Sequence, residues 1–187
     1  MTAVEIVNLA LAMMGVSPLM AFDDPTQVAQ TASTIYLPTL KHCLSVHNWN
    51  FAMKAVQLAK TASDLPNWQY AFQEPSDVLK IESVRDGDNN AVVYEEINGK
   101  IYADADTIIL RYVYYYDNIE PMLPPYFIEV LKYKLAADLS IPLKGDYNLY
   151  KAYITLYEQA LRLARGLDSQ RGKVRFVDNS KWLAGLW

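Results

Sequence analysis

The side chains best suited to nucleophilic or metal chemistry gather in one short segment. His42 and His47 are the only histidines and Cys43 is the only cysteine. A separation of five positions does not bring both histidines to one helical face, as a local metal site requires. Neighbouring helical side chains point about 100° apart, so His42 and Cys43 do not form a local dyad. We expect Cys43 to be a small core residue, and pairing of these groups with residues distant in sequence stays open.

The segment from Asp86 to Asn90 resembles the start of a calcium-binding loop. Asp86, Asp88 and Asn90 match its first three ligand positions. Ala91 replaces the required glycine, and Ile97 stands where the bidentate glutamate belongs. We therefore interpret this segment as a turn between strands.

Other acid–base or phosphate-binding motifs are absent from the sequence. Glu95 and Glu96 are adjacent on a predicted strand, so their carboxylates face opposite sides. The seven glycines form no phosphate-binding run. We therefore expect a protein without enzymatic activity, cofactor or metal.

Length and charge limit the classes of protein that fit. A chain of 187 residues can bury a core without disulfides or metals. Its net charge of −4 argues against gripping nucleic acid through the phosphates, but not against a protein that DNA merely passes. The 52% hydrophobic content and 14 tyrosines fit either a compact core or subunit interfaces. No stretch reaches the roughly 20 apolar residues of a membrane span, and no basic region precedes the first apolar run, so we expect a cytoplasmically made protein without a membrane segment.

Hydrophobic periodicity predicts an α+β fold, a four-helix bundle with an antiparallel β-sheet inserted between the second and third helices. Thr2 and Glu5 have capping-box spacing at the start of the first helix. Asp24 is expected to cap the second helix, and Pro142 to end the third. The predicted helices cover residues 2–15, 25–47, 124–141 and 146–166, with the sheet insertion at 55–116.

The fourth predicted helix has the clearest amphipathic pattern in the chain. Its apolar stripe predicts the face that packs on the core. The stripe consists of Leu149, Ala152, Tyr153, Leu156, Ala160, Leu163 and Leu167.

The predicted sheet is an antiparallel meander. Asn98-Gly99 between two alternating segments predicts a tight hairpin. The last strand is apolar on both faces apart from Arg111, so we expect both faces to be covered, at least one of them by helices. The candidate strands are 55–60, 68–73, 78–84, 91–97, 100–103 and 107–115.

Trp49 and Phe51 lie where the helical period gives way to the strand period. Aromatic side chains commonly fill corners of this kind. We interpret the two residues as a helix–sheet junction that holds the end of the second helix on the sheet.

We expect residues 1–168 to form one domain and residues 169–187 to form an extended C-terminal tail. Each large apolar side chain left in water forgoes about 1.5–3 kcal/mol, so the tail is expected to dock, either on its own domain or in a partner's groove. The tail is basic first and aromatic last, with Arg171, Lys173 and Arg175 followed by Phe176, Trp182, Leu183, Leu186 and Trp187.

In the order and spacing of several short segments, the chain resembles the head-to-tail adaptor, or tail tubular protein A, family of short-tailed bacteriophages. The resemblance covers nearly the whole chain. It is carried by Gly15-Val-Ser-Pro18, Asn48-Trp-Asn-Phe-Ala-Met-Lys54, Trp68-Gln-Tyr-Ala-Phe72, Pro75-Ser-Asp-Val-Leu79, Tyr102, Leu110-Arg-Tyr112 and the segment from Pro125 to Ala136.

The resemblance implies a structural protein of the virion neck, assembled in the host cytoplasm. It implies a ring of twelve subunits between the portal protein and the tail nozzle, with double-stranded DNA passing through without sequence-specific binding. It also implies that the segment from Arg171 to Trp187 is a portal-docking arm. The turns near Asp86–Asn90 and Asn98-Gly99 would then face the nozzle or neighbouring subunits.

Two alternatives from other classes stay open. One is an oligomeric module that binds a small ligand in a pocket lined by the tyrosine-rich strand. The other is a hydrolase whose site is assembled from distant residues, for which abnormal titration of Cys43 or a histidine would be the sign.

Overall fold

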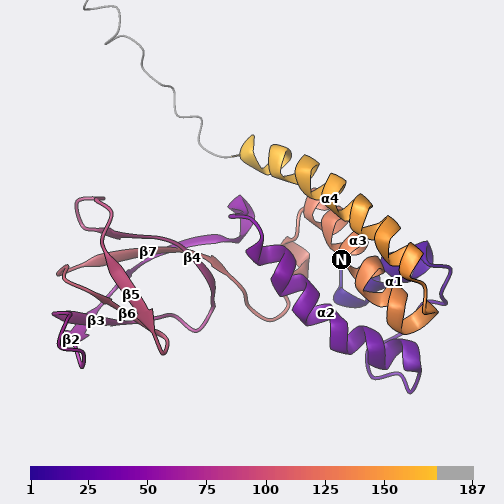
Figure 1. Cartoon of the computed structure of the whole chain (residues 1–187), viewed down its shortest axis with the longest axis horizontal. Coiled ribbons are helices and arrows are strands. Elements are labelled where there is room, and N and C mark those ends of the chain that lie inside the picture. The colour runs from indigo at the N-terminus through magenta and orange to yellow at the C-terminus, as the bar shows by residue number, and fades with distance from the viewer. Residues whose placement is uncertain (172–187) are drawn as a thin grey trace, which may run out of the picture.

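The computed structural model describes residues 1–171, and these form an α+β fold with four α-helices and two antiparallel sheets inserted between α2 and α3. Figure 1 shows the helices gathered at one end of the long axis and the strands at the other. The predicted fold class is therefore confirmed. The helices are α1 (Ala3–Met13), α2 (Gln27–Ser45), α3 (Pro125–Lys144) and α4 (Tyr147–Ser169), with short 3-10 helices η1 (Asn50–Ala52) and η2 (Glu120–Met122). Among the described helices, none is both long and apolar enough to cross a membrane.

The helix starts follow side-chain capping, with one correction. The predicted capping box of α1 is present: the Glu5 amide donates to Thr2 Oγ1 at 3.2 Å, and the Thr2 amide donates to Glu5 Oε2 at 2.8 Å. For α2 the predicted Asp24 cap is wrong, because Thr26 accepts the first-turn amide of Ala29 instead. The Asp24 carboxylate instead accepts the amides of Met20 and Ala21, which precede it in the chain, at 2.9 and 3.1 Å.

The end of α3 also differs from the prediction. The helix runs through Pro142 and ends at Gly145, which has φ of +64° and donates its amide to the Ile141 carbonyl at 2.8 Å. A proline in the last turn removes one amide, while the left-handed glycine beyond it supplies the helix stop. Asp146 then caps α4 by accepting the amides of Asn148 and Leu149, so α3 and α4 form a helical hairpin.

The buried face of α4 is rotated away from the predicted leucine stripe. Tyr153, Tyr157, Ala160 and Ala164 face the core, and the Tyr153 hydroxyl donates to the Met13 carbonyl at 2.7 Å. The small alanines let α3 approach closely. The predicted stripe is therefore wrong in part, because Leu156, Leu163 and Leu167 are 37%, 71% and 49% exposed.

The strands divide between two sheets, where we expected one. One sheet has the order β1 (Met53–Leu58), β7 (Ile108–Tyr114), β4 (Val78–Asp86), and the other has the order β2 (Lys60–Ala62), β3 (Tyr70–Gln73), β6 (Lys100–Ala103), β5 (Tyr94–Ile97). The chain changes sheet already at Ala59, between β1 and β2. Alternation along a strand reveals its buried face but not its partner, so it does not show how the strands are shared out.

The two sheets share a core of their own. Phe72 and Ile101 from one sheet pack with Ile108, Leu110 and Tyr112 of β7 from the other. This face of β7 is covered as expected, by the second sheet. On the opposite face the helical core covers only Val113, whereas Arg111 is exposed. The prediction that both faces are covered is therefore wrong for this face.

The predicted hairpin at Asn98-Gly99 is confirmed. Both residues have positive φ, +51° and +72°, and the flanking residues Ile97 and Lys100 are paired across β5 and β6. Two left-handed residues in a two-residue loop give the turn type whose twist matches that of the strands.

Gly145 and Gly166 provide a matched pair of tests for the helix ends. Gly145→Ala should lower the free energy of unfolding by about 1 kcal/mol, because its φ of +64° is unfavourable for any residue with a Cβ. Gly166→Ala, inside α4 with free space around the new Cβ, should raise it by about 0.5–1 kcal/mol. Urea denaturation of both variants measures the difference. Equal effects of the two substitutions would contradict the assigned end of α3.

Candidate functional site

A buried carboxylate ties the end of α4 to the junction between helix and strand. Asp168 is fully buried, and its carboxylate accepts the Asn50 amide at 2.9 Å, Asn50 Nδ2 at 3.1 Å and the Tyr126 hydroxyl at 2.7 Å. Asn50 Nδ2 also donates to the Asp168 carbonyl at 2.7 Å. One side chain therefore joins the last turn of α4, η1 and the first turn of α3.

Trp49 and Phe51 lie beside this carboxylate, within the same junction. Trp49 is fully buried, and its Nε1 donates to the Cys43 carbonyl at 2.9 Å, near the end of α2. Both rings lie edge-on to Phe127, at centroid distances of 5.2 Å for Trp49 and 5.1 Å for Phe51. Trp49 also lies edge-on to His47 at 4.8 Å. The aromatic partners that the two rings share, Tyr126 and Phe127, are on α3, whereas we expected the partners on the sheet.

His47 is next to Asp168 without forming a strong pair with it. The His47 Nε2 atom lies 3.6 Å from Asp168 Oδ2, which is longer than a hydrogen bond. Partial burial lowers the pKa of His47 below its usual value, and the Asp168 charge only partly opposes this effect. Burial, together with the hydrogen bond to Asp168, raises the pKa of Tyr126 to about 12. Near neutral pH the carboxylate is therefore held by neutral donors, an arrangement suited to structure rather than to proton transfer.

Cys43 has none of the features of a catalytic thiol. It is fully buried, and burial raises the pKa of the thiol to about 12. Reactive cysteines have a lowered pKa and a partly exposed sulfur.

Within residues 1–171 no group of three or more histidine, cysteine or acidic side chains could hold a metal ion. The Asp86 carboxylate closes its own turn by accepting the amides of Asp88 and Asn90.

The tyrosine-rich strand borders a hollow of about 430 Å³ near Lys54, Asp77 and Tyr114. The Asp77 carboxylate accepts Lys54 Nζ at 2.7 Å and the Tyr112 hydroxyl at 2.9 Å. The polar groups around the hollow therefore bond to one another. In a ligand site they would instead point together into the empty space.

Of the eight predicted docking residues, Arg171 lies in the part of the chain that the structure describes. Its guanidinium lies 5.3 Å from the centroid of the Tyr126 ring, and its amide donates to the Asp168 carbonyl at 3.0 Å. The tail therefore begins at a point fixed by the Asp168 contacts. Lys173, Arg175, Phe176, Trp182, Leu183, Leu186 and Trp187 lie outside the described residues.

Asp168 was missed by the sequence analysis, although a signal for it existed. A carboxylate in the last turn of a helix opposes the helix dipole, so an acidic residue there suggests compensating donors. Its donors, Asn50 and Tyr126, are 118 and 42 positions away, too far for any local pattern to identify them.

Asp168→Ala should lower the free energy of unfolding by about 2 kcal/mol, because the half-buried Tyr126 hydroxyl and the Asn50 amide lose the charged acceptor that ties them to α4. Urea denaturation followed by circular dichroism measures the loss. Asp106→Ala is the matched control, since Asp106 pairs with Lys60 on the surface and its side chain is 76% exposed. The control should be unchanged, and a similar result for both variants would show that Asp168 does not hold the junction.

His47 should titrate below pH 6.5 in the folded protein, as followed by NMR of its imidazole. A lowered pKa means that the unfolded chain binds the proton more readily, so this contribution to stability is present above about pH 6.5 and is lost as the pH falls. Between pH 7 and 5, His47→Gln should therefore lose less stability than the native chain. An elevated His47 pKa would contradict the assignment.

Comparison with known proteins identifies no family for this chain. Neither a scan against protein-family models nor a search of curated proteins gives a match. The contacts described above, together with the resemblance in the order of short segments, are therefore the grounds on which a function can be inferred.

Proposed function

We propose that the chain is a head-to-tail adaptor of a short-tailed phage, a structural subunit whose ring joins the portal to the tail nozzle. The order of short segments along the chain supports this proposal. The fold is compatible with it, because the antiparallel strands interrupt the helices between α2 and α3.

The single observation that carries the proposal is the fixed origin of the C-terminal tail. The last turn of α4 is held by the buried Asp168, and Arg171 lies against Tyr126 directly after it. The 16 residues that follow contain three more basic residues, Lys173, Arg175 and Lys181, before the aromatic end. A fixed base followed by such a segment suits an arm that reaches into a neighbouring protein.

The net charge of −4 is consistent with a channel wall. A surface that neutralised many phosphates would bind the passing duplex and slow its movement. In the proposed ring, DNA passes without sequence-specific contacts, and the turns at Asp86–Asn90 and Asn98-Gly99 meet the nozzle or neighbouring subunits.

The proposal is tested by mixing the full chain with the portal protein encoded beside it and measuring the mass of the complex by native mass spectrometry. The expected complex contains about as many copies of this chain as the portal ring has subunits. The complex should be lost when the four large apolar residues Trp182, Leu183, Leu186 and Trp187 are all replaced by serine, which keeps the length and charge of the tail.

A double variant outside the tail serves as the control. Met20→Ser with Val93→Ser changes two residues that are 87% and 80% exposed, so it should fold and assemble normally. If the intact chain, shown to be folded by circular dichroism, forms no complex with the portal ring, the adaptor proposal is wrong.

A further inference from the structure

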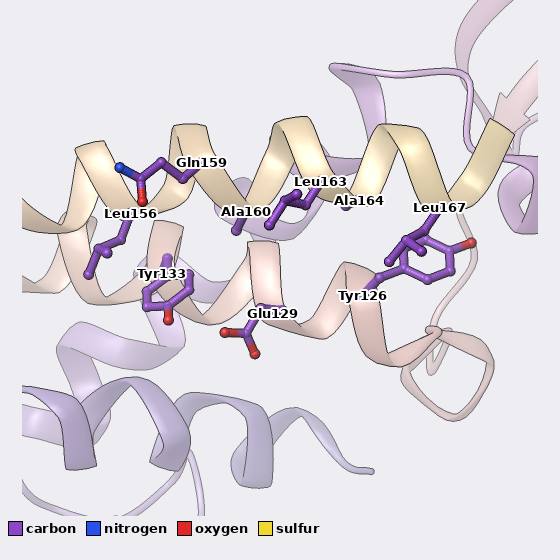
Figure 2. Close-up of a pocket in the computed structure, with 9 residues that line it drawn as sticks. All are labelled: Tyr126, Glu129, Tyr133, Leu156, Gln159, Ala160, Leu163, Ala164 and Leu167. Carbon is purple, nitrogen blue, oxygen red and sulfur yellow. The ribbon is translucent and has the colours of Figure 1, made fainter. Parts of the chain in front are cut away.

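An apolar groove runs between α3 and α4, with a volume of about 270 Å³. Figure 2 shows Ala160, Leu163 and Leu167 on α4, and Tyr126 and Tyr133 on α3, along this groove. The groove is deep at the buried Ala160 and Ala164, because a short side chain fills little of the space between two helices.

The groove is edged by the leucines that the sequence pattern had placed in the core. Leu156, Leu163 and Leu167 lie at spacings of seven and four, so they form one stripe along α4, and all three are exposed. A contiguous apolar patch of this kind marks a surface that binds another segment.

The chain leaves α4 at one end of this groove. Leu167 and Tyr126 line that end, and Arg171 already lies over the Tyr126 ring at 5.3 Å. A guanidinium above an aromatic face is a favourable contact. Arg171, two residues beyond the end of α4, thus touches a residue that lines the groove.

We propose that the groove binds the chain's own C-terminal segment, Trp182 to Trp187, when no other partner holds it. The segment offers two tryptophans and two leucines to an apolar groove. This intramolecular contact rests on the groove and the tail sequence, so it stands whether or not the chain is an adaptor.

The length of the tail permits this contact. Eleven steps from Arg171 to Trp182 span up to about 36 Å when extended, whereas Leu156 and Leu167 are about 17 Å apart along the helix axis. Even if about four residues are used to reverse direction, as in a β-turn, the remaining seven reach the whole groove. Tethering gives the segment an effective concentration on the order of millimolar, which favours its own groove over that of a second copy.

The test is NMR of the tryptophan indoles in the full chain, with Trp182 and Trp187 assigned by Trp→Phe substitution. In the native chain both tail indoles should be displaced from the position of a solvent-exposed tryptophan, and their hydrogen exchange should be slowed about tenfold. Leu163→Asp should return both signals to the exposed position. Leu163 is 71% exposed, so the fold tolerates the change, and unaltered Trp49 and Trp68 signals verify this. If those signals move, the milder Leu163→Ser replaces it.

Thr155→Asp is the matched control, because it adds the same charge to an exposed position of α4 outside the groove, and it should leave the tail signals unchanged. Exposed tail indoles in the native chain, or signals unmoved by Leu163→Asp, would overturn the proposal. Signals that change on tenfold dilution would assign the groove to a second copy's tail and overturn the intramolecular contact. Portal binding is measured separately, so a failure here is distinguishable from a failure of the adaptor proposal.

Discussion

The buried carboxylate of Asp168 is the constraint on which the arrangement of the helices depends. A carboxylate withdrawn from water is stable only where donors replace its hydration, and here Asn50 and Tyr126 supply them. These donors belong to η1 and α3, so satisfying one side chain brings three separate parts of the chain together. It also fixes the rotation of α4 about its own axis, since Asp168 must face inward with Ala164 one turn before it.

That rotation explains why the hydrophobic pattern of α4 misled the sequence analysis. A stripe of leucines predicts the core face when the core is the only apolar environment available. In the folded chain, tyrosines bury their rings, and Tyr153 donates its hydroxyl to a backbone carbonyl, while alanines permit close contact with α3. The leucines are left on the outer face. Hydrophobicity alone does not distinguish a surface that packs within the domain from one that binds something else.

Features set by local chemistry were predictable from the sequence, and features set by distant partners were not. The capping box of Thr2 and Glu5 and the Asn98-Gly99 hairpin follow from a few adjacent residues, and both are present. The division into two sheets depends on which strands pair across long separations, and the short edge strand β2 is exposed throughout, so it has no alternation to detect. The change of period located the junction at Trp49, whereas its tie to Asp168 joins residues more than a hundred positions apart.

The chain leaves the helical part of the molecule and returns to it at one place. Met53 at the start of β1 is paired with Val113 near the end of β7, so the two ends of the whole insertion lie side by side. The segment between these two residues is a self-contained insertion, with a core of its own between the two sheets. Such an insertion can lengthen, shorten or be exchanged without changing the distance that α2 and α3 must bridge. The helices and the strands can therefore diverge at different rates, each adapting to its own surroundings.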